Sequence, residues 1–125
     1  MQADRDCVLV VEDDEMLLEL FEELLGRQYA VRIARGVDEA MRELDEHEIA
    51  AVVTDLHIGM ENGLVLIERV RRCYPHLSSR LLLLTGVSAS EVRKFGVPVL
   101  TKPVDGGTLL DAVNGVITRG TDAVS

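Results

Sequence analysis

The chain has 125 residues, 47 % of them hydrophobic and 28 % charged, values that are typical of one globular domain with a single core. Acidic residues outnumber basic ones by 22 to 13, and the net charge of −9 disfavours attraction to nucleic acid or to an anionic membrane. Because there is no apolar run long enough to cross a bilayer, no secretory signal and no CxxC pair, we expect a cytoplasmic protein whose Cys7 and Cys73 stay reduced.

Short apolar runs alternate with amphipathic segments along the whole chain. The runs predict five strands, at Cys7–Val11, Tyr29–Ala34, Ala50–Thr54, Arg80–Leu84 and Val97–Thr101. Helical spacing predicts five helices, at Leu17–Leu25, Val37–Leu44, Gly63–Arg72, Ser88–Phe95 and Asp105–Thr118, and the fourth of them is short. Residues 119–125 are small and polar, and we expect them to form a frayed tail.

Strands that alternate regularly with helices predict an α/β fold, a doubly wound parallel sheet with helices on both faces. Pro98 cannot donate a backbone hydrogen bond, so the fifth strand belongs at an edge of the sheet. In such sheets the functional site lies beyond the carboxyl ends of the strands, where the strand order reverses. The residues that follow each strand are therefore the first place to look for chemistry.

Chemically useful side chains follow four of the five predicted strands. In chain order these side chains are Glu12, Asp13, Asp14, Asp55, Thr85 and Lys102. Carboxylates that converge at one sheet edge repel one another unless a cation lies between them. An all-oxygen set without histidine or cysteine side chains favours Mg²⁺. With Lys102 as a second cation, Thr85 as a hydroxyl donor and Asp55 as a nucleophile, the set predicts phosphoryl transfer to an aspartate.

These residues resemble the receiver (response-regulator) family of two-component signalling. The resemblance rests on the segments Val10–Asp14, Asp55-Leu56 with Asn62-Gly63, Leu84–Gly86 and Thr101–Pro103, which follow one another in the family's order. It implies a flavodoxin-like (βα)5 sheet of strand order 2-1-3-4-5 and a single receiver domain over residues 1–125, with its core at about 7–118. It also implies a histidine kinase or a histidine phosphotransfer protein as partner, and we expect a monomer.

The resemblance assigns a role to each matching residue. Glu12 and Asp13 match the acidic pair that holds Mg²⁺, and Asp13 is the expected direct ligand. Asp55 matches the phosphoacceptor and a further metal ligand, and His57 matches the position whose backbone carbonyl completes the metal shell. Thr85 and Lys102 match the hydroxyl and the ammonium that meet the phosphoryl group. A cis peptide is implied before Pro103.

The sequence departs from the family pattern at two of these segments. Gly59 stands where the family usually has proline, and Val99 stands where many members carry the Tyr or Phe that moves on activation. On the first helix, Leu17, Leu18 and Phe21 cannot all face the core. We therefore expect part of this helix to present apolar surface for partner docking, with Leu18 as the residue to test.

Three other functions can be weighed against a receiver that modifies itself and is not a turnover enzyme. A magnesium-dependent phosphohydrolase with an aspartyl-phosphate intermediate usually has a second acid two residues after the nucleophile, and here that place is His57. A flavodoxin-like cofactor binder needs a Gly-rich phosphate loop after the first strand, which is absent from the sequence. A phosphorylation-independent adaptor would not need the acidic residues together with Thr85 and Lys102.

Overall fold

The structure, a computed structural model, describes residues 5–86 and 96–124. Within these residues five parallel strands form one sheet in the order β2-β1-β3-β6-β7. The strands are β1 (Cys7–Val11), β2 (Ala30–Ala34), β3 (Ala51–Asp55), β6 (Leu81–Thr85) and β7 (Val99–Thr101). The predicted order, 2-1-3-4-5 for the five long strands, is confirmed. The short helix predicted at Ser88–Phe95 lies outside the described residues.

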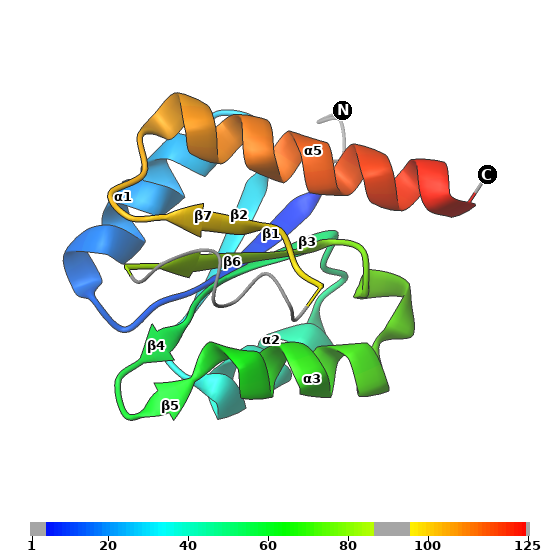
Figure 1. The fold of residues 1–125 in the computed structure, drawn as a ribbon, viewed down its shortest axis with the longest axis horizontal. Helices are drawn as coiled ribbons and strands as arrows, with labels where there is room; N and C mark the ends of the chain where they lie inside the picture. Colours follow the sequence, from blue (N-terminus) through cyan, green and yellow to red (C-terminus); the bar gives the residue numbers. More distant parts are fainter. Residues whose placement is uncertain (1–4, 87–95, 125) are drawn as a thin grey trace.

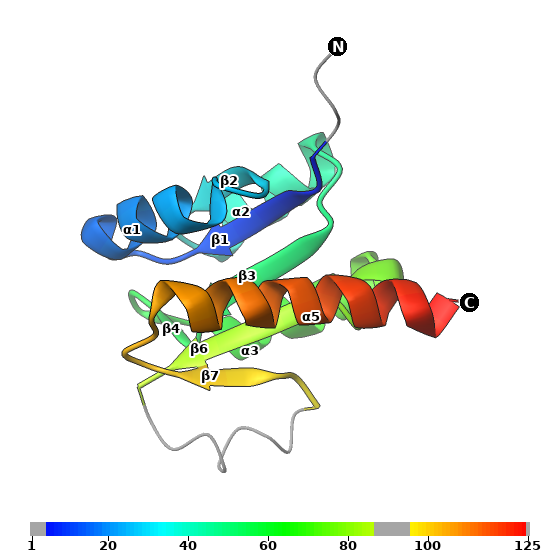
Figure 2. The ribbon, with the colours of Figure 1, turned by 90° about the horizontal axis from the view of Figure 1, so that it is seen from above.

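Helices cover both faces of the sheet. Among the described residues they are α1 (Glu15–Leu25), α2 (Val37–Glu46), α3 (Gly63–Cys73) and α5 (Gly106–Val124), with a short 3₁₀ turn η1 (Pro75–Leu77) after α3. Figures 1 and 2 show α1 and α5 on one face of the sheet and α2 and α3 on the other. None of the helices in this described part is long and apolar enough to cross a bilayer.

The alternation of side chains along the central strands divides the core in two. Leu9 and Leu83 pack with α2 and α3, whereas Val8, Val53 and Leu82 pack with α1 and α5. All of these side chains are at most 1 % exposed. Burying one Val or Leu side chain stabilises the folded state by roughly 1.5–3 kcal/mol. A shift of a strand by one residue would turn these side chains to the opposite face of the sheet, so the two halves of the core hold the strands in register.

Side chains that cap the helix N-terminus begin two of the helices. Asp14 precedes α1, and its Oδ1 accepts hydrogen bonds from the backbone N–H groups of Met16 at 2.9 Å and Leu17 at 3.3 Å. Asn62 precedes α3, and its Oδ1 accepts from the N–H of Leu64 at 2.7 Å. Both residues satisfy donors that have no partner inside the helix.

The last helix is longer than predicted. We expected it to end at about Thr118 and residues 119–125 to fray, but α5 continues to Val124. Once a helix has formed, each further residue adds a backbone hydrogen bond, so the helix can extend beyond Val116, the last buried residue among the side chains described up to position 118. At the sheet edge the prediction from Pro98 is confirmed, because β7 pairs with β6 alone and the carbonyl of Pro98 accepts from Leu83 N–H at 3.0 Å.

A small hairpin directly after β3 was not predicted. Strands β4 (His57–Ile58) and β5 (Glu61–Asn62) pair antiparallel across the two residues Gly59 and Met60. Gly59 has a φ of +60°, the conformation that a tight hairpin favours at the first residue of its turn. Proline is confined to a φ near −65°, so the glycine at this position of the family pattern has a structural reason.

Gly63, the first residue of α3, packs directly against the backbone of Asp55. A Cβ at position 63 would lie 2.1 Å from the carbonyl oxygen of Asp55 and 3.1 Å from its carbonyl carbon. The N–H of Gly63 also donates to the carbonyl of Leu56 at 2.6 Å. The start of α3 is therefore fixed against the end of β3 by a contact that only glycine allows.

Replacing Gly63 with alanine should lower the free energy of unfolding by about 1–3 kcal/mol, because backbone atoms must move to admit the methyl group. The matched control is Gly86→Ala, since a Cβ at position 86 would meet no atom of the described residues within 4 Å. Urea unfolding followed by circular dichroism measures both variants. Equal stability of Gly63→Ala and the parent chain would show that this contact does not constrain the fold.

Candidate functional site

Three carboxylates meet at the carboxyl edge of the sheet. Glu12 and Asp13 follow β1, and Asp55 is the last residue of the neighbouring strand β3. One ligand oxygen from each of the three lies within 4.8 Å of the other two. Asp13 is exposed, whereas Glu12 and Asp55 are only 2 % and 7 % exposed. The structure therefore brings together the acidic residues that the sequence analysis selected.

The ammonium group of Lys102 lies between two of these carboxylates. Lys102 follows β7, and its Nζ donates to Oδ2 of Asp55 at 2.9 Å and to Oε1 of Glu12 at 3.1 Å. The lysine side chain is 25 % exposed, so it approaches the carboxylates from the rim of the pocket. Its positive charge offsets repulsion between acids that the parallel strands place at one edge.

Glu12 is the most deeply buried of the three acids, and both of its oxygens are engaged. Oε1 accepts from Lys102, and Oε2 accepts from the backbone N–H of Asp14 at 3.2 Å. Burial raises the pKa of Glu12 above its ordinary value, and the charge of Asp55 raises it further. The hydrogen bonds from the Asp14 backbone and from Lys102 oppose this shift without cancelling it.

The same contacts affect Lys102 in the opposite way. Burial alone would lower the pKa of Lys102, but the hydrogen bonds to Asp55 and Glu12 outweigh it, so the pKa lies above its ordinary value. Lys102 is therefore fully charged at neutral pH, and the pocket holds a permanent cation beside Asp55.

Thr85 and His57 lie at the ends of the two strands β6 and β3 or directly beyond them. Thr85 ends β6 and is fully buried, and its carbonyl accepts from the N–H of Lys102 at 2.7 Å. Its neighbour Leu84 pairs with Asp55 across β3 and β6. His57 lies two residues after Asp55 on the hairpin, with its side chain exposed. The peptide between Lys102 and Pro103 is cis, as the resemblance implied.

The donor set fits a hard divalent cation such as Mg²⁺. It offers carboxylate oxygens from two adjacent strand ends and no sulfur ligand. Both oxygens of Glu12 already have partners, so Asp13 and Asp55 carry the more accessible oxygens. Within the described residues no other cluster of three such ligands is found.

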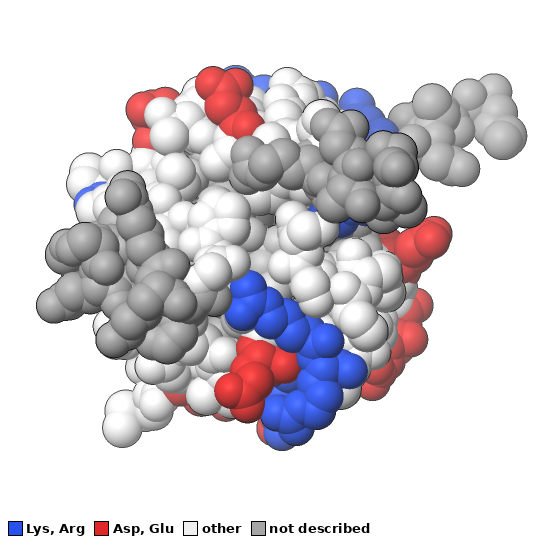
Figure 3. Space-filling model, turned by 45° about the vertical axis from the view of Figure 1, so that its right-hand side comes forward, with Lys and Arg blue, Asp and Glu red and all other residues white. Residues whose placement is uncertain are grey.

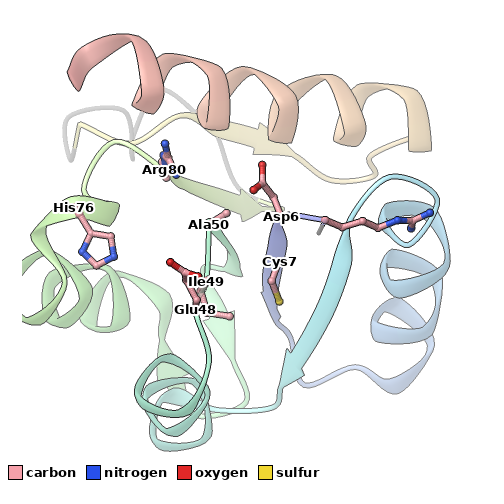
Figure 4. A pocket seen from close by; sticks show the side chains of 8 residues that line it. Asp6, Cys7, Glu48, Ile49, Ala50, His76 and Arg80 are labelled. Atoms are coloured by element: carbon pink, nitrogen blue, oxygen red, sulfur yellow. The ribbon is translucent and has the colours of Figure 1, made fainter. Parts of the chain in front are cut away.

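A second pocket, of about 270 Å³, lies at the opposite edge of the sheet. It is lined by residues around the starts of β1 and β3 and by residues near η1: Arg5, Asp6, Cys7, Glu48, Ile49, Ala50, His76 and Arg80. Figure 4 shows Asp6 and Cys7 at the start of β1, with Glu48 and His76 on two other segments around the pocket. Burial raises the pKa of the Cys7 thiol, which keeps this cysteine in its less reactive protonated form.

Charge on the molecular surface is mixed on the face seen in Figure 3. Basic side chains form a narrow strip that touches acidic ones, and uncharged residues cover much of the remaining surface. Ion pairs of this kind link α2 with α3 through Asp38 and Arg69 at 3.6 Å, and Glu68 with Arg72 at 3.0 Å. The described residues on this face form no broad basic surface of the kind that binds phosphate backbones.

The sequence matches the response regulator receiver domain family over residues 8–114. The chain belongs to this family. The match includes all of β1 but its first residue, the acidic residues after it, Asp55, Thr85 and Lys102, so the residues that meet in the pocket are all inside the matched region of the receiver domain.

Curated relatives of this receiver domain are regulatory proteins. It is 32 % identical over 113 residues to the response regulator protein PilR of Pseudomonas aeruginosa, covering 87 % of this chain and 25 % of the relative. It is 28 % identical over 122 residues to the transcriptional regulatory protein GlrR of Escherichia coli, covering 93 % of this chain and 27 % of the relative. The receiver chain thus spans about a quarter of the length of these relatives.

Solved structures support the fold. A response regulator receiver domain protein from Clostridium thermocellum is 26 % identical, with a TM-score of 0.82 over 93 % of this chain and 97 % of that one. A CheY-like receiver domain protein from Methanospirillum hungatei is 21 % identical, with a TM-score of 0.86 over 96 % of this receiver domain and 99 % of that chain. The second likeness concerns the fold alone.

The structure corrects one expectation about α1. Leu18, chosen from the sequence as a docking residue, is 1 % exposed and packs in the core with α5. The apolar surface of α1 is formed instead by Met16 and Leu20, which are 79 % and 44 % exposed. Helical spacing defines which residues share a face but not which of two adjacent apolar faces meets the sheet.

The shifted pKa of Glu12 predicts a change in the pH dependence of stability. Between the ordinary carboxyl pKa of 4.5 and the raised value in the receiver fold, the folded state retains a proton that the unfolded chain has released. The contribution of Glu12 to stability therefore falls as the pH rises through this window. The variant Glu12→Gln should lose this fall in urea unfolding measured without divalent ions, and parallel pH profiles would contradict the assignment.

Proposed function

We propose that this receiver domain accepts a phosphoryl group on Asp55 from a phosphohistidine of a histidine kinase or histidine phosphotransfer protein. The observation that carries the proposal is the placement of Asp55 within 2.9 Å of the Lys102 ammonium and beside Glu12 and Asp13. This combines a nucleophilic carboxylate, a fixed cation and a metal-type donor set in one pocket. The family match over residues 8–114 supports it and supports treating residues 1–125 as one receiver domain.

In this proposal an oxygen of Asp55 attacks phosphorus while the bond from phosphorus to the donor imidazole nitrogen breaks. The electron pair of that bond leaves with the imidazole, and Asp55 becomes an acyl phosphate. Lys102 stabilises negative charge on the transferred group, as a preorganised cation beside the acceptor can do. Thr85, at the adjacent strand end, would donate its hydroxyl to a phosphoryl oxygen.

Glu12, Asp13, Asp55 and the carbonyl of His57 would hold Mg²⁺. The metal, when bound, supplies positive charge that offsets the phosphoryl oxygens. Asp13 is the proposed direct ligand, because it is exposed while both oxygens of Glu12 have partners. Glu12 would contribute to the metal site less directly, and it also orients Lys102 by accepting its hydrogen bond.

The receiver modifies itself once for each donor encounter, and the phosphorylated form changes its protein contacts. A cytoplasmic site of action is part of the proposal and agrees with the two free cysteines.

The rival phosphohydrolase would have to use His57 as its general acid–base. The His57 side chain is exposed on the β4–β5 hairpin, whereas a general acid–base in a hydrolase usually lies in an enclosed site. Continuous release of phosphate from small phosphoesters would favour that rival.

Incubation with acetyl phosphate and Mg²⁺ should add one phosphoryl group to the parent chain and none to Asp55→Asn, because an amide cannot form the acyl phosphate. Intact-protein mass spectrometry detects the product. The matched control is Asp14→Asn, which removes a nearby acid outside the pocket and keeps a good helix cap. Phosphorylation of Asp55→Asn would overturn the proposed acceptor. So would a parent chain that remains unmodified with several different donors.

A donor that must reach Asp55 has to touch the surface beside Lys102. A mainly apolar groove of about 350 Å³ lies there, between α1 and the segment after β7. It is lined by Leu17, Leu20, Phe21, Lys102, Pro103 and Val104. We therefore place part of the donor's docking surface on this groove, with Leu20 as its exposed apolar contact.

Leu20→Glu should slow phosphoryl transfer from a phosphorylated donor protein by about tenfold, as loss of a contact worth more than 1 kcal/mol would. Transfer from acetyl phosphate should stay unchanged, since the small donor needs no groove. The control is Val65→Glu, an equally drastic change at a 53 % exposed position on α3. Equal transfer rates for both variants with the protein donor would place docking elsewhere.

A further inference from the structure

The hairpin that follows Asp55 is tied to α2 by one side chain. Oε1 of Glu61, on β5, accepts a hydrogen bond from the backbone N–H of Val37 at 3.0 Å. Val37 is the first residue of α2, so this N–H has no partner inside the helix. The preceding residue, Gly36, has no side chain that could serve as a cap. A carboxylate from a distant segment therefore supplies the missing acceptor.

The glycine at position 36 makes room for this contact. Gly36 has a φ of −167° and a ψ of 175°, an extended conformation that any residue adopts. Its backbone therefore does not require glycine. A Cβ at this position would lie 2.9 Å from Oε1 of Glu61 and would meet nothing else within 4 Å. Among the residues that the structure describes, the absence of a side chain at position 36 therefore makes room for the Glu61 carboxylate.

The tied hairpin borders the acidic pocket. A Cβ on Gly59, at the hairpin turn, would lie 3.7 Å from Oδ2 of Asp13. The other end of the hairpin is held by Gly63, whose N–H donates to Leu56 at 2.6 Å. Strands β4 and β5 contain only two residues each, and an isolated pair that short is marginal in water. The contact of Glu61 with α2 thus fixes the part of the hairpin that its own pairing holds weakly.

We infer that Glu61 is a positioning residue for the metal site: by capping α2 it holds the hairpin, and with it the backbone carbonyl of His57, against the acidic pocket. The inference rests on the proposed function, because it assigns Glu61 a role in forming that site. Glu61 touches neither the phosphoryl group nor the metal in this scheme. It acts by raising the fraction of molecules in which the hairpin is correctly placed.

The fraction of molecules with a correctly placed hairpin determines the apparent affinity for Mg²⁺. When the binding-competent conformation is only partly occupied, the apparent dissociation constant rises by the inverse of the occupied fraction. Loss of a helix-capping hydrogen bond is of the size that shifts such a fraction by about three- to tenfold. Glu61→Ala should therefore raise the apparent dissociation constant for Mg²⁺ by about that factor.

A conservative variant separates the hydrogen bond from the charge. Glu61→Gln keeps an oxygen that can accept from Val37 but removes the negative charge. If Glu61 acts by holding the hairpin, Glu61→Gln should bind Mg²⁺ within about twofold of the parent chain. If its charge merely attracts the cation, Glu61→Gln should be as weak as Glu61→Ala, and the inference would be wrong.

A second, independent variant changes the other partner. Gly36→Ala should displace the Glu61 carboxylate from Val37, because among the described residues, chain neighbours aside, this is the atom that the new methyl group would meet, and so weaken Mg²⁺ binding as Glu61→Ala does. In the double variant the two changes should not add, because the same hydrogen bond is already lost. Additive effects would show that residues 36 and 61 act separately and would overturn the inference.

The experiment is a calorimetric titration of MgCl₂ into each variant without a phosphoryl donor, together with hydrogen exchange at the Val37 amide. This amide should be protected in the parent chain and in Glu61→Gln, and exchange faster in Glu61→Ala and Gly36→Ala. Unchanged Mg²⁺ affinity and unchanged exchange in Glu61→Ala would overturn the inference.

Phosphorylation of Asp55 is tested separately, so the two proposals can fail separately. A parent chain that binds Mg²⁺ in a Glu61-dependent manner but accepts no phosphoryl group would overturn the proposed function and leave the role of Glu61 standing. A chain that accepts a phosphoryl group while Glu61→Ala binds Mg²⁺ normally would do the reverse. Absence of Mg²⁺ binding to the parent chain would overturn the inference together with the metal site.

Discussion

The contact of the Lys102 ammonium with Glu12 and Asp55 is the interaction on which the arrangement of this receiver domain depends. Parallel strands bring their carboxyl ends to one edge, and the sequence places acids at two adjacent ends. Such acids are stable together only when their charge is offset, and removing one partner of a buried pair leaves an uncompensated charge. The edge strand β7 is therefore more than a border of the sheet, because it delivers the cation that the two inner strands require.

The strands and the residues beyond them could be predicted from the sequence because the signals are local. A short continuous apolar run such as Leu81–Leu84 favours a strand covered on both faces, and the residue after it then lies at the carboxyl edge of the sheet. Thr85, Asp55 and Lys102 were selected in this way, and the structure places all three at the same edge. The caps at Asp14 and Asn62 were also readable, since a cap acts on residues two or three positions away.

The features that could not be predicted depend on contacts between distant segments. The strands β4 and β5 are too short to show a period of two, and the single clue, Gly59, is equally compatible with an open loop. The bond between Glu61 and Val37 joins residues far apart in the chain, and glycine at position 36 has meaning only once that bond is known. Leu18 was misassigned because the helix has apolar residues on two adjacent sides, and only packing against α5 decides between them.

The three consecutive acids after β1 have three separate environments. Glu12 is buried with both oxygens bonded, Asp13 is exposed toward the acidic cluster, and Asp14 caps α1. The three side chains are chemically similar, but each position has its own environment and role. Surface loops generally accept insertions at little thermodynamic expense. This turn is an exception, because one residue more or fewer would exchange the three environments, and its length is therefore as constrained as its composition.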